Sequence, residues 1–458
     1  MTGDVSRDVE LQAFRQRYPA IDRVYALLCD ANGVFRGKRL ADDELDELYA
    51  HGRGVASSML WLDMTGKDIA DYDLVWEDGD SDRLCWPVPG TLTPAPWLGE
   101  RYGQVMLTMF EPDGTPTPTD PRHVLGAVLA RLTAQGLTPV VAAELEFYLV
   151  DKERTPDGKL QPPRAPRTGM RSQFKRGYEV DDIEDFQPVL SEIQDSARQL
   201  GIPAETVISE YGPGQFEVTL HHQADALRAM DQAVLFKRLI KGIALKHGML
   251  ATFMAKAYSN ESGSGLHMHM SMLDQNGHNI FSAPEVEGSP ALRHVIGGLQ
   301  AHMADTMLLF GPNANSYRRL RAGFYAPVNT AWAVNNRTVS LRIPSSTPAA
   351  RRVEHRVAGA DANPYLVLAA ILAAAHDGLL HQRDPGTPAV GDACRTAGYG
   401  QLPTHWMDAI ERFANSAFVA DYFTKDFLDT YVATKRGELA EFVGEVTLLD
   451  YEWYLRNA

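Results

Sequence analysis

Apolar and polar positions alternate along several short stretches of the chain, the pattern of a β-strand with one buried face. One such stretch is TPVVAAELEFYLV at residues 138–150, and further strands are predicted at residues 250–256, 266–273, 338–344 and 352–357. In YALLCDANGVFRGKRL, residues 25–40, two strand-like runs flank an Asn-Gly pair, which predicts a β-hairpin. The first 115 residues are expected to be rich in strands and turns.

Apolar residues at helical spacing predict helices at residues 120–136, 185–201 and 225–248. The first of these follows a proline-rich stretch, and Asp120 and Pro121 suit its cap and first turn. The apolar run at residues 365–375 is too short to span a bilayer and predicts a buried helix. Polar residues 151–180 predict a long surface excursion. Together these elements indicate an α+β chain with a largely antiparallel sheet and a boundary near residue 120.

Composition narrows the class of protein. A length of 458 residues favours two or three domains, and a net charge of -15 argues against nucleic acid or an anionic membrane as a partner. The three cysteines are far apart, which fits a reducing compartment and excludes a cysteine-rich zinc site. The polar, acidic start of the chain is unlike a signal peptide. A cytoplasmic protein with small-molecule partners is therefore expected.

Residues two apart on a strand share a face, and this rule gathers charged residues on the predicted strands. Glu144 and Glu146 oppose Leu145 and Phe147. In GSGLHMHMS the two histidines oppose Leu266, Met268 and Met270. Further charged residues lie on the polar faces of the predicted strands or beside them, namely Glu210, Glu217, Arg337, Arg342, Arg352, Glu354 and Arg356.

Buried carboxylates are costly unless they are paired or bind a metal. The five glutamates, pooled with His267, would form a site for a hard cation such as Mg²⁺ or Mn²⁺. The arginines suit carboxylates and phosphates. Each motif alone is also compatible with a solvated strand face or a structural histidine pair. The order of the motifs, with glycine-rich turns beside two of them, favours the site.

The chain resembles the glutamine synthetase family from about residue 20 to its C-terminus. The matching stretches, in order, are ELEFYLV, PGQFEV, ATFMAK, GSGLHMHMS, NSYRRLRAGFYAP, NNRTVSLRIP and RRVEHRVAGADANPYL. Within the family, CDANGVFRGKR, DGKLQPPRAP and HRVAGADANPYLV resemble the γ-glutamylputrescine synthetase branch.

This resemblance implies a small N-terminal β-grasp domain at residues 1–118 and a large catalytic domain with a curved antiparallel sheet at residues 119–458. It also implies a homododecamer of two stacked hexameric rings, with active sites between neighbouring subunits. Two or three Mg²⁺ or Mn²⁺ ions and ATP, as co-substrate, are implied at each site.

Roles for individual residues follow from the same resemblance. Glu144, His267 and Glu354 match the ligands of the metal that faces the ATP phosphates, and Glu146, Glu210 and Glu217 match those of the metal near glutamate. Arg319, Arg356 and Gly263 match the glutamate site, where Ser262 replaces an expected asparagine. Arg337, Arg342 and Arg352 match positions near the phosphates, and His269 and Ser271 match nucleotide contacts. Arg319, Arg337 and Arg342 are expected to act in catalysis.

Two departures from the family bear on the amine. Val55 stands where glutamine synthetases carry an ammonium-binding aspartate, and Tyr325 stands where they carry a flap glutamate. These side chains suit an alkyl amine, and the face of Tyr325, Phe324 or Trp61 could hold its cation. Drift at a packing position is the alternative for Val55.

The sequence therefore predicts an ATP-dependent ligase that joins glutamate to a primary alkyl amine, such as putrescine or another polyamine, through γ-glutamyl phosphate. The alternatives are a glutamine synthetase that uses ammonium, a non-catalytic scaffold or sensor, and another carboxylate-rich metal kinase. The length of the amine, the anchor of its far end and the base that deprotonates it stay open.

Overall fold

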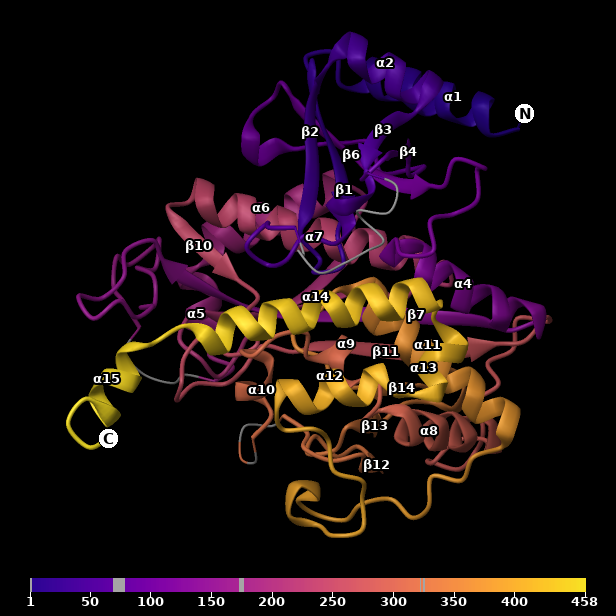
Figure 1. Cartoon of the computed structure of the whole chain (residues 1–458), viewed down its shortest axis with the longest axis vertical. Helices are drawn as coiled ribbons and strands as arrows, with labels where there is room; N and C mark the ends of the chain where they lie inside the picture. The colour runs from indigo at the N-terminus through magenta and orange to yellow at the C-terminus, as the bar shows by residue number, and fades with distance from the viewer. Residues whose placement is uncertain (1, 69–78, 173–176, 322, 324–325) are drawn as a thin grey trace.

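Two β-sheets organise the chain, and helices cover both (Figure 1). The computed structural model describes residues 2–68, 79–172, 177–321, 323 and 326–458, with side chains from residue 7 onward. Among these residues the N-terminal sheet has the order β2-β1-β6-β4-β3, with β5 paired to β6. Its strands are β1 (Arg23–Cys29), β2 (Phe35–Ala41), β3 (Arg53–Ala56), β4 (Asp82–Pro87), β5 (Thr93–Pro94) and β6 (Tyr102–Phe110).

The predicted hairpin is confirmed. β1 and β2 pair antiparallel, and Gly33 in the turn adopts a φ of 73°. Asp30 holds the turn together, because its carboxylate accepts hydrogen bonds from Val34 N at 2.8 Å and Arg36 Nε at 2.9 Å. β1 also pairs with β6 in parallel, which ties the hairpin into the sheet.

Two helices in this region were not predicted, namely α1 (Thr2–Arg17) and α2 (Asp42–His51). α2 buries Leu45, Leu48 and Tyr49, and it packs against β1, β2 and β4. Its first turn carries three acidic residues, which favour a helix N-terminus. Strand and turn patterns dominate the surrounding sequence, and they obscured this short helical stretch.

The second sheet has the order β12-β13-β14-β11-β7-β9-β8, with β10 paired to β7. All of its pairings are antiparallel except β12 with β13, so the prediction of a largely antiparallel sheet is confirmed. The strand at residues 266–273 was predicted with the right bounds, whereas those at 250–256, 338–344 and 352–357 are shorter than predicted. The strands are β7 (Thr138–Asp151), β8 (Ala204–Ser209), β9 (Gln215–Leu220), β10 (Met249–Thr252), β11 (Leu266–Leu273), β12 (Trp332–Val334), β13 (Leu341–Ile343) and β14 (Val353–His355).

The predicted helices are all present. α4 (Pro121–Ala134) is capped by Asp120, and α7 (Ala226–Lys246) packs against β7 and β10. α6 (Gln187–Gln199) packs against α7, and α11 (Pro364–His381) packs against α4 and α8 (Pro290–His302). α11 is longer than the run predicted at residues 365–375, and in the part of the chain that the structure describes it alone is long and apolar enough to cross a membrane. As predicted it is a buried helix, with 83% of its apolar window buried inside the protein.

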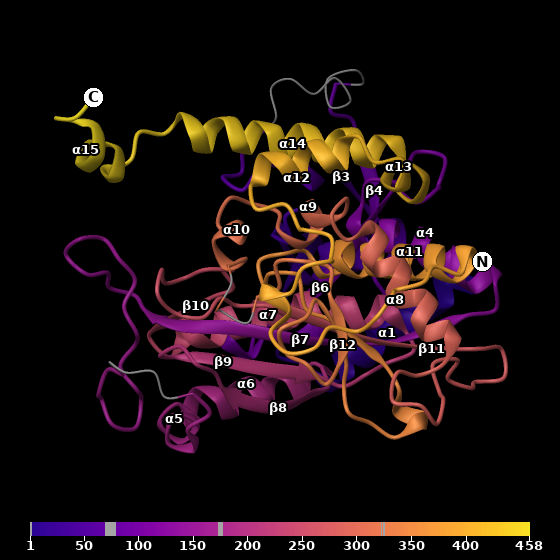
Figure 2. The same ribbon diagram turned by 90° about the horizontal axis from the view of Figure 1, so that it is seen from below.

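The remaining helices lie mostly towards the C-terminus. α14 extends past both the N-terminal sheet and the second sheet, and α15 projects away from the body of the protein (Figures 1 and 2). These helices are α5 (Val180–Asp185), α9 (Met307–Phe310), α10 (Ser316–Arg319), α12 (Trp406–Ala414), α13 (Ala417–Tyr422), α14 (Lys425–Gly444) and α15 (Leu448–Tyr454), with 3-10 turns η1 (Ser57–Leu60), η2 (Pro96–Leu98), η3 (Pro348–Ala350) and η4 (Ala393–Arg395).

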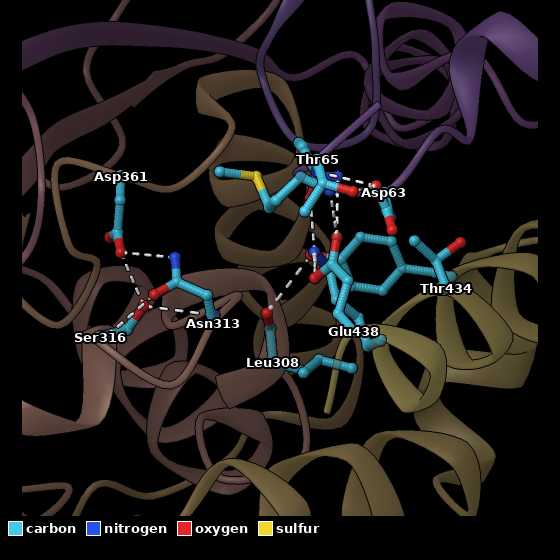
Figure 3. Close-up of polar contacts among 12 residues, drawn as sticks. Asp63, Thr65, Leu308, Asn313, Ser316, Asp361, Thr434 and Glu438 are labelled. Atoms are coloured by element: carbon cyan, nitrogen blue, oxygen red, sulfur yellow. Dashed lines mark hydrogen bonds and ion pairs between the residues drawn. The ribbon is translucent and has the colours of Figure 1, made fainter. Parts of the chain in front are cut away.

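A buried polar cluster joins the N-terminal hairpin to α14 (Figure 3). Glu438 Oε1 accepts hydrogen bonds from Asn32 Nδ2 at 3.1 Å and Met64 N at 3.0 Å. Lys435 Nζ lies 2.9 Å from Glu438 Oε2, and it also donates to Asn32 Oδ1. The Lys435 side chain is fully buried. The pair therefore holds two charges away from water and depends on both partners.

We predict that Lys435→Met lowers the free energy of unfolding by about 3 kcal/mol, because Glu438 would remain buried without its cation. Lys67→Met is the control, since Lys67 pairs with Glu441 at the same joint but both side chains are more than half exposed. That variant should lose less than about 1 kcal/mol. Urea denaturation at fixed protein concentration measures both, and equal losses in the two variants would contradict a special role for the buried pair.

Candidate active site

Strand register brings the predicted acidic and histidine side chains onto one face of the second sheet. His267 on β11 pairs with Glu144 on β7, and Glu146 on β7 pairs with Glu217 on β9. On the other side of β11, His269 pairs with Glu354 on β14, which in turn pairs with Arg342 on β13. Residues directly opposite each other on neighbouring strands point to the same side of a sheet. The alternation predicted within single strands thus continues across five neighbouring strands, β9, β7, β11, β14 and β13.

The opposite face is apolar, as predicted. Leu145, Phe147, Val218 and Met268 are fully buried in the hydrophobic core. His355, which lies between Glu354 and Arg356, belongs to that face and packs against Phe310 with ring centroids 4.6 Å apart. Burial lowers its pKa to about 3, so His355 is a neutral packing residue.

Two histidines and two glutamates meet at the centre of the polar face. Glu144 Oε1 lies 2.8 Å from His267 Nδ1, and Glu144 Oε2 lies 3.2 Å from His269 Nε2. His267 Nδ1 is also 3.8 Å from Glu354 Oε1. Burial alone would raise the pKa of Glu144, but the hydrogen bonds from both histidines outweigh it and hold that pKa well below the usual value.

A second group of carboxylates lies beside the first. Burial, with the charges of Glu144 and Glu146, raises the pKa of Glu217 to about 11. Burial, with the charge of Glu146, raises the pKa of Glu210 to about 7. Glu210 is half-buried at the end of β8, where the Gly-Pro-Gly turn leads into β9. Crowded acids of this kind are neutralised by protons or by a cation.

The donor set fits a divalent cation. Ligand atoms of Glu144, Glu217 and His267 all lie within 4.8 Å of one another, and so do those of Glu144, His269 and Glu354. A shell dominated by carboxylate oxygens with one imidazole suits Mg²⁺ or Mn²⁺. These groupings differ from the expected ones: His269 was assigned to the nucleotide, yet it lies as near to Glu144 and Glu354 as a metal ligand would. The assignment of ligands to separate ions stays a prediction.

Arginines border the acidic cluster along β13 and β14. Arg342 Nη1 donates to Glu354 Oε2 at 2.8 Å, and Arg356 Nη1 donates to Glu354 Oε1. Burial would raise the pKa of Glu354, but the charges of Arg356 and His267 lower it to about 2. Glu354 is therefore ionised, and each arginine keeps further N–H donors for another anion.

Arg319 is held at the edge of the same cluster by backbone carbonyls. Its Nη1 donates to Val357 O at 2.8 Å and its Nη2 to Arg356 O at 3.3 Å. The glycine-rich turn before β11 closes over it. A Cβ on Gly263 would lie 2.6 Å from Arg319 Cγ, and one on Gly265 would lie 2.7 Å from Arg319 Nη2 and 2.8 Å from His267 Nε2. Only glycine lets this turn pass between the arginine and the histidine.

The other predicted site residues lie farther out. Arg352 Nε is 3.4 Å from His269 Nδ1, and Ser271 is half-buried two positions beyond His269 on the same face of β11. Arg337 is exposed on the segment between β12 and β13. Its charge acts on Glu210 across the site. The nucleotide and phosphate roles expected for these residues stay predictions.

Of the residues expected to contact the amine, the two that the structure describes, Val55 and Trp61, lie outside this cluster. Val55 lies on β3 in the other sheet, where it pairs with Arg83 and is buried in the core. Tyr325 and Phe324 lie outside the described residues. Trp61 is buried edge-on against Phe427 and Tyr431, with centroid distances of 5.8 and 6.5 Å. Its face is enclosed, so the suggestion that it could hold the amine cation is wrong for this chain.

Sequence reasoning missed two side chains that support the glycine-rich turn. Gln215 Nε2 donates to Gly263 O at 3.0 Å, and Tyr148 Oη donates to Ser262 O at 2.8 Å. Gln215 lies two residues before Glu217 on the same strand face, so the period of two could have identified it. Tyr148 lies two residues after Glu146, where the same argument applies.

Metal-free protein is predicted to lose stability as pH rises, because Glu217 must release its proton in a buried site. Its pKa is raised from 4.5 to about 11, so between these values the folded state holds a proton that the unfolded chain has released. Stability is full below the lower value and falls as pH approaches the upper one. The free energy of unfolding should fall by up to about 1.4 kcal/mol per pH unit.

Unfolding in EDTA at about pH 6 and about pH 9 measures this effect. Glu217→Gln, which mimics the protonated carboxyl, should weaken the pH dependence. Glu205→Gln is the control, because Glu205 is half exposed and pairs with His221. Equal pH dependence in wild type and Glu217→Gln would contradict the assignment of a buried proton to Glu217.

Comparison with known proteins agrees with this geometry. The family model described as glutamine synthetase, catalytic domain, matches residues 118–454. The γ-glutamylputrescine synthetase of Escherichia coli strain K12 is 42% identical over 98% of this chain and 95% of its own length. The glutamate–isopropylamine ligase of a Pseudomonas species is 31% identical over 92% of each chain. The solved GmaS/ADP complex matches with a TM-score of 0.83 and 30% identity over 97% of this chain and 99% of its own. The chain belongs to the glutamine synthetase family.

Proposed function

We propose that this protein is an ATP-dependent ligase that forms a γ-glutamyl amide between L-glutamate and a primary alkyl amine such as putrescine. The observation that carries the proposal is the polar face of the second sheet, where acids, histidines and arginines gather in a chain whose relatives join glutamate to amines. A non-catalytic scaffold is not favoured, because all six predicted metal ligands are present, five of them on this face and Glu210 at the turn leading into β9.

Six residues would hold the divalent cations, namely Glu144, His267 and Glu354 for one and Glu146, Glu210 and Glu217 for another. Bound Mg²⁺ or Mn²⁺ supplies positive charge that neutralises the phosphate oxygens of ATP and favours transfer of the γ-phosphoryl group. The chain's own part is to hold these side chains in place before substrate arrives. Cross-strand pairing does this, since the side chains project from neighbouring strands of one sheet.

Arg319 and Arg356 would bind the carboxylates of glutamate, and Gly263 would border that pocket. The guanidinium of Arg319 is fixed by two carbonyls, so its remaining donors point in set directions. Arg342 and Arg352 border the acidic cluster on the side of β14, where they would meet phosphate oxygens, with Arg337 beyond them. His269 and Ser271 would contact the nucleotide.

The proposed reaction has two steps. An oxygen of the glutamate γ-carboxylate forms a bond to the γ-phosphorus of ATP, and ADP leaves. The nitrogen of a neutral amine then bonds to the acyl carbon, inorganic phosphate leaves and the amine loses a proton. Water would hydrolyse the intermediate, so exclusion of water by the buried sheet face and the tight turn at Gly263 protects it.

The two acids that bind ammonium in glutamine synthetases are replaced in this chain. Val55 and Tyr325 replace an aspartate and a glutamate, so no carboxylate at these positions would hold ammonium and take its proton. Apolar and aromatic groups suit the methylene chain of an alkyl amine. This argument favours the alkyl amine over ammonium as substrate.

We also propose a homododecamer of two hexameric rings, with residues 1–118 as an N-terminal domain and 119–458 as the catalytic domain. The exposed apolar side chains of α15 support association. Leu448 is 76% exposed and Trp453 is 58% exposed on a helix that projects from the body. Under this proposal the β3 segment that carries Val55 would lie near the site of a neighbouring subunit. The cytoplasmic location expected from composition remains a prediction.

An amine panel tests the proposed substrate class. Phosphate release from ATP with glutamate should be faster with putrescine than with ammonium, by at least about ten-fold in kcat/KM, because methylene contacts favour the larger amine. Monoamines, spermidine and spermine complete the panel, and Glu354→Gln is the control that should lose activity with every amine. Ammonium matching or exceeding every alkyl amine would indicate a glutamine synthetase instead.

A further inference from the structure

A cleft of about 530 Å³ lies between the N-terminal sheet and α7, away from the acidic cluster. Its walls come from three places in the chain: the hairpin turn at Gly33–Phe35, the η2 turn with Trp97, and the last three turns of α7. This volume is typical of sites for small molecules. No role in the proposed ligase reaction uses it.

The floor of the cleft is cationic. Lys237 and Lys241 are four residues apart on α7, so they project from the same side of the helix. Their ammonium groups lie 5.2 and 5.7 Å from the centroid of the Phe253 ring. Among the described residues that line the cleft, none is acidic. Lys241 is exposed, and within the described part of the chain it contacts the Phe253 ring and forms no ion pair. Lys246 at the rim differs, because it pairs with Glu192 at 2.7 Å.

Lys237 is a buried cation with a donor to spare. Its side chain is 8% exposed, and its Nζ donates to Ala360 O at 2.8 Å and Ala362 O at 3.4 Å. An ammonium group has three donors, so one remains for a ligand. Burial and the nearby charge of Lys241 lower the pKa of Lys237 to about 7. The charge of Asp361 raises that pKa and offsets part of this effect, and a further anion in the cleft would favour the charged ammonium.

Trp97 lines the same cleft as these lysines. The Trp97 indole packs directly on Gly242, since a Cβ there would lie 2.3 Å from Trp97 Cδ1. The Arg238 guanidinium lies 5.9 Å from the same ring and is held by Gln104 Oε1 at 3.0 Å. Phe35 adds apolar surface on the side of the hairpin. A planar body would therefore fit beside the cationic floor.

We propose that this cleft binds a small organic anion, with its carboxylate or phosphate on Lys237 and Lys241 and its planar body against Trp97. The anion would add negative charge beside both ammonium groups, and ammonium groups bind carboxylates and phosphates. This site is separate from the nucleotide and glutamate sites proposed above.

Lys237 connects the cleft to the glutamate pocket. Its two carbonyl partners flank Asp361, whose carboxylate is held by Ser316 and Asn313, each at 2.8 Å (Figure 3). On the other side, Ala360 N donates to Ser264 O at 2.9 Å, and Leu266 N donates to Ala358 O at 2.9 Å. The segment at residues 358–362 thus packs between the cleft and the turn at Gly263. Occupancy of the cleft should change the KM for glutamate.

Calorimetry on the full chain tests binding without any need for ligase activity. The probes are phenyl phosphate and benzoate, which share a planar body, with inorganic phosphate and acetate as the bare anions. The aromatic probes should bind better than the bare anions, and the stronger of the two identifies the oxyanion. Lys241→Met should weaken binding by about ten-fold or more, and Lys241→Arg should restore it to within about three-fold of wild type.

Lys246→Met is the matched control, because it removes a lysine from the same rim whose charge already faces Glu192. It should change binding by less than about two-fold. No heat of binding with any probe at up to about 10 mM would overturn the proposal, as would binding that Lys241→Met leaves unchanged.

Kinetics test the connection to glutamate, and this arm alone rests on the proposed function. The bound probe should shift the KM for glutamate in wild type and not in Lys241→Met. Binding without a shift would overturn the connection while leaving the anion site intact. If wild-type protein showed no ligase activity at all, that result would instead count against the proposed function.

Discussion

The pairing of β7 with β11 and β9 places His267 opposite Glu144 and Glu217 opposite Glu146. A shift of one residue in either pairing would turn the acids of that strand into the core and its apolar residues towards solvent. The core residues Leu145, Phe147 and Met268, all fully buried on the opposite face, prevent such a shift. The geometry of the site is therefore fixed by hydrophobic packing on the far side of the same strands.

The same pairing brings several carboxylates close together, and only some of them have a cationic partner. Glu354 is kept ionised by Arg356 and His267, and Glu144 by two histidines. Among the described residues Glu217 forms no ion pair with an arginine or a histidine, and its pKa rises to about 11. A fold selected for stability alone would not crowd acids in this way. The crowding of acids around Glu217 favours a cation at the site. A metal-binding role accounts for the polar side chains on this face of the sheet.

Much of this arrangement was predictable from short-range patterns. The alternation in GSGLHMHMS gave β11 and its two faces, and the neutral, buried His355 follows the same rule. The grouping of His269 with Glu144 and Glu354 was not predicted, because it depends on cross-strand register, which arises from contacts distant in the sequence. The aromatic surroundings of Trp61 come from α14, more than three hundred residues later. The cationic cleft could not be predicted from the sequence, because two lysines four residues apart on a helix are also typical of a solvent-exposed helix face.

The central claim is that register-paired carboxylates and histidines on this sheet form a divalent metal site. Anomalous X-ray diffraction from crystals grown with Mn²⁺ tests it most directly. The account predicts Mn²⁺ peaks coordinated by side chains of the set Glu144, Glu146, Glu210, Glu217, His267 and Glu354. Well-ordered crystals in which Mn²⁺ binds only elsewhere, or in which these side chains lie too far apart to share an ion, would contradict it.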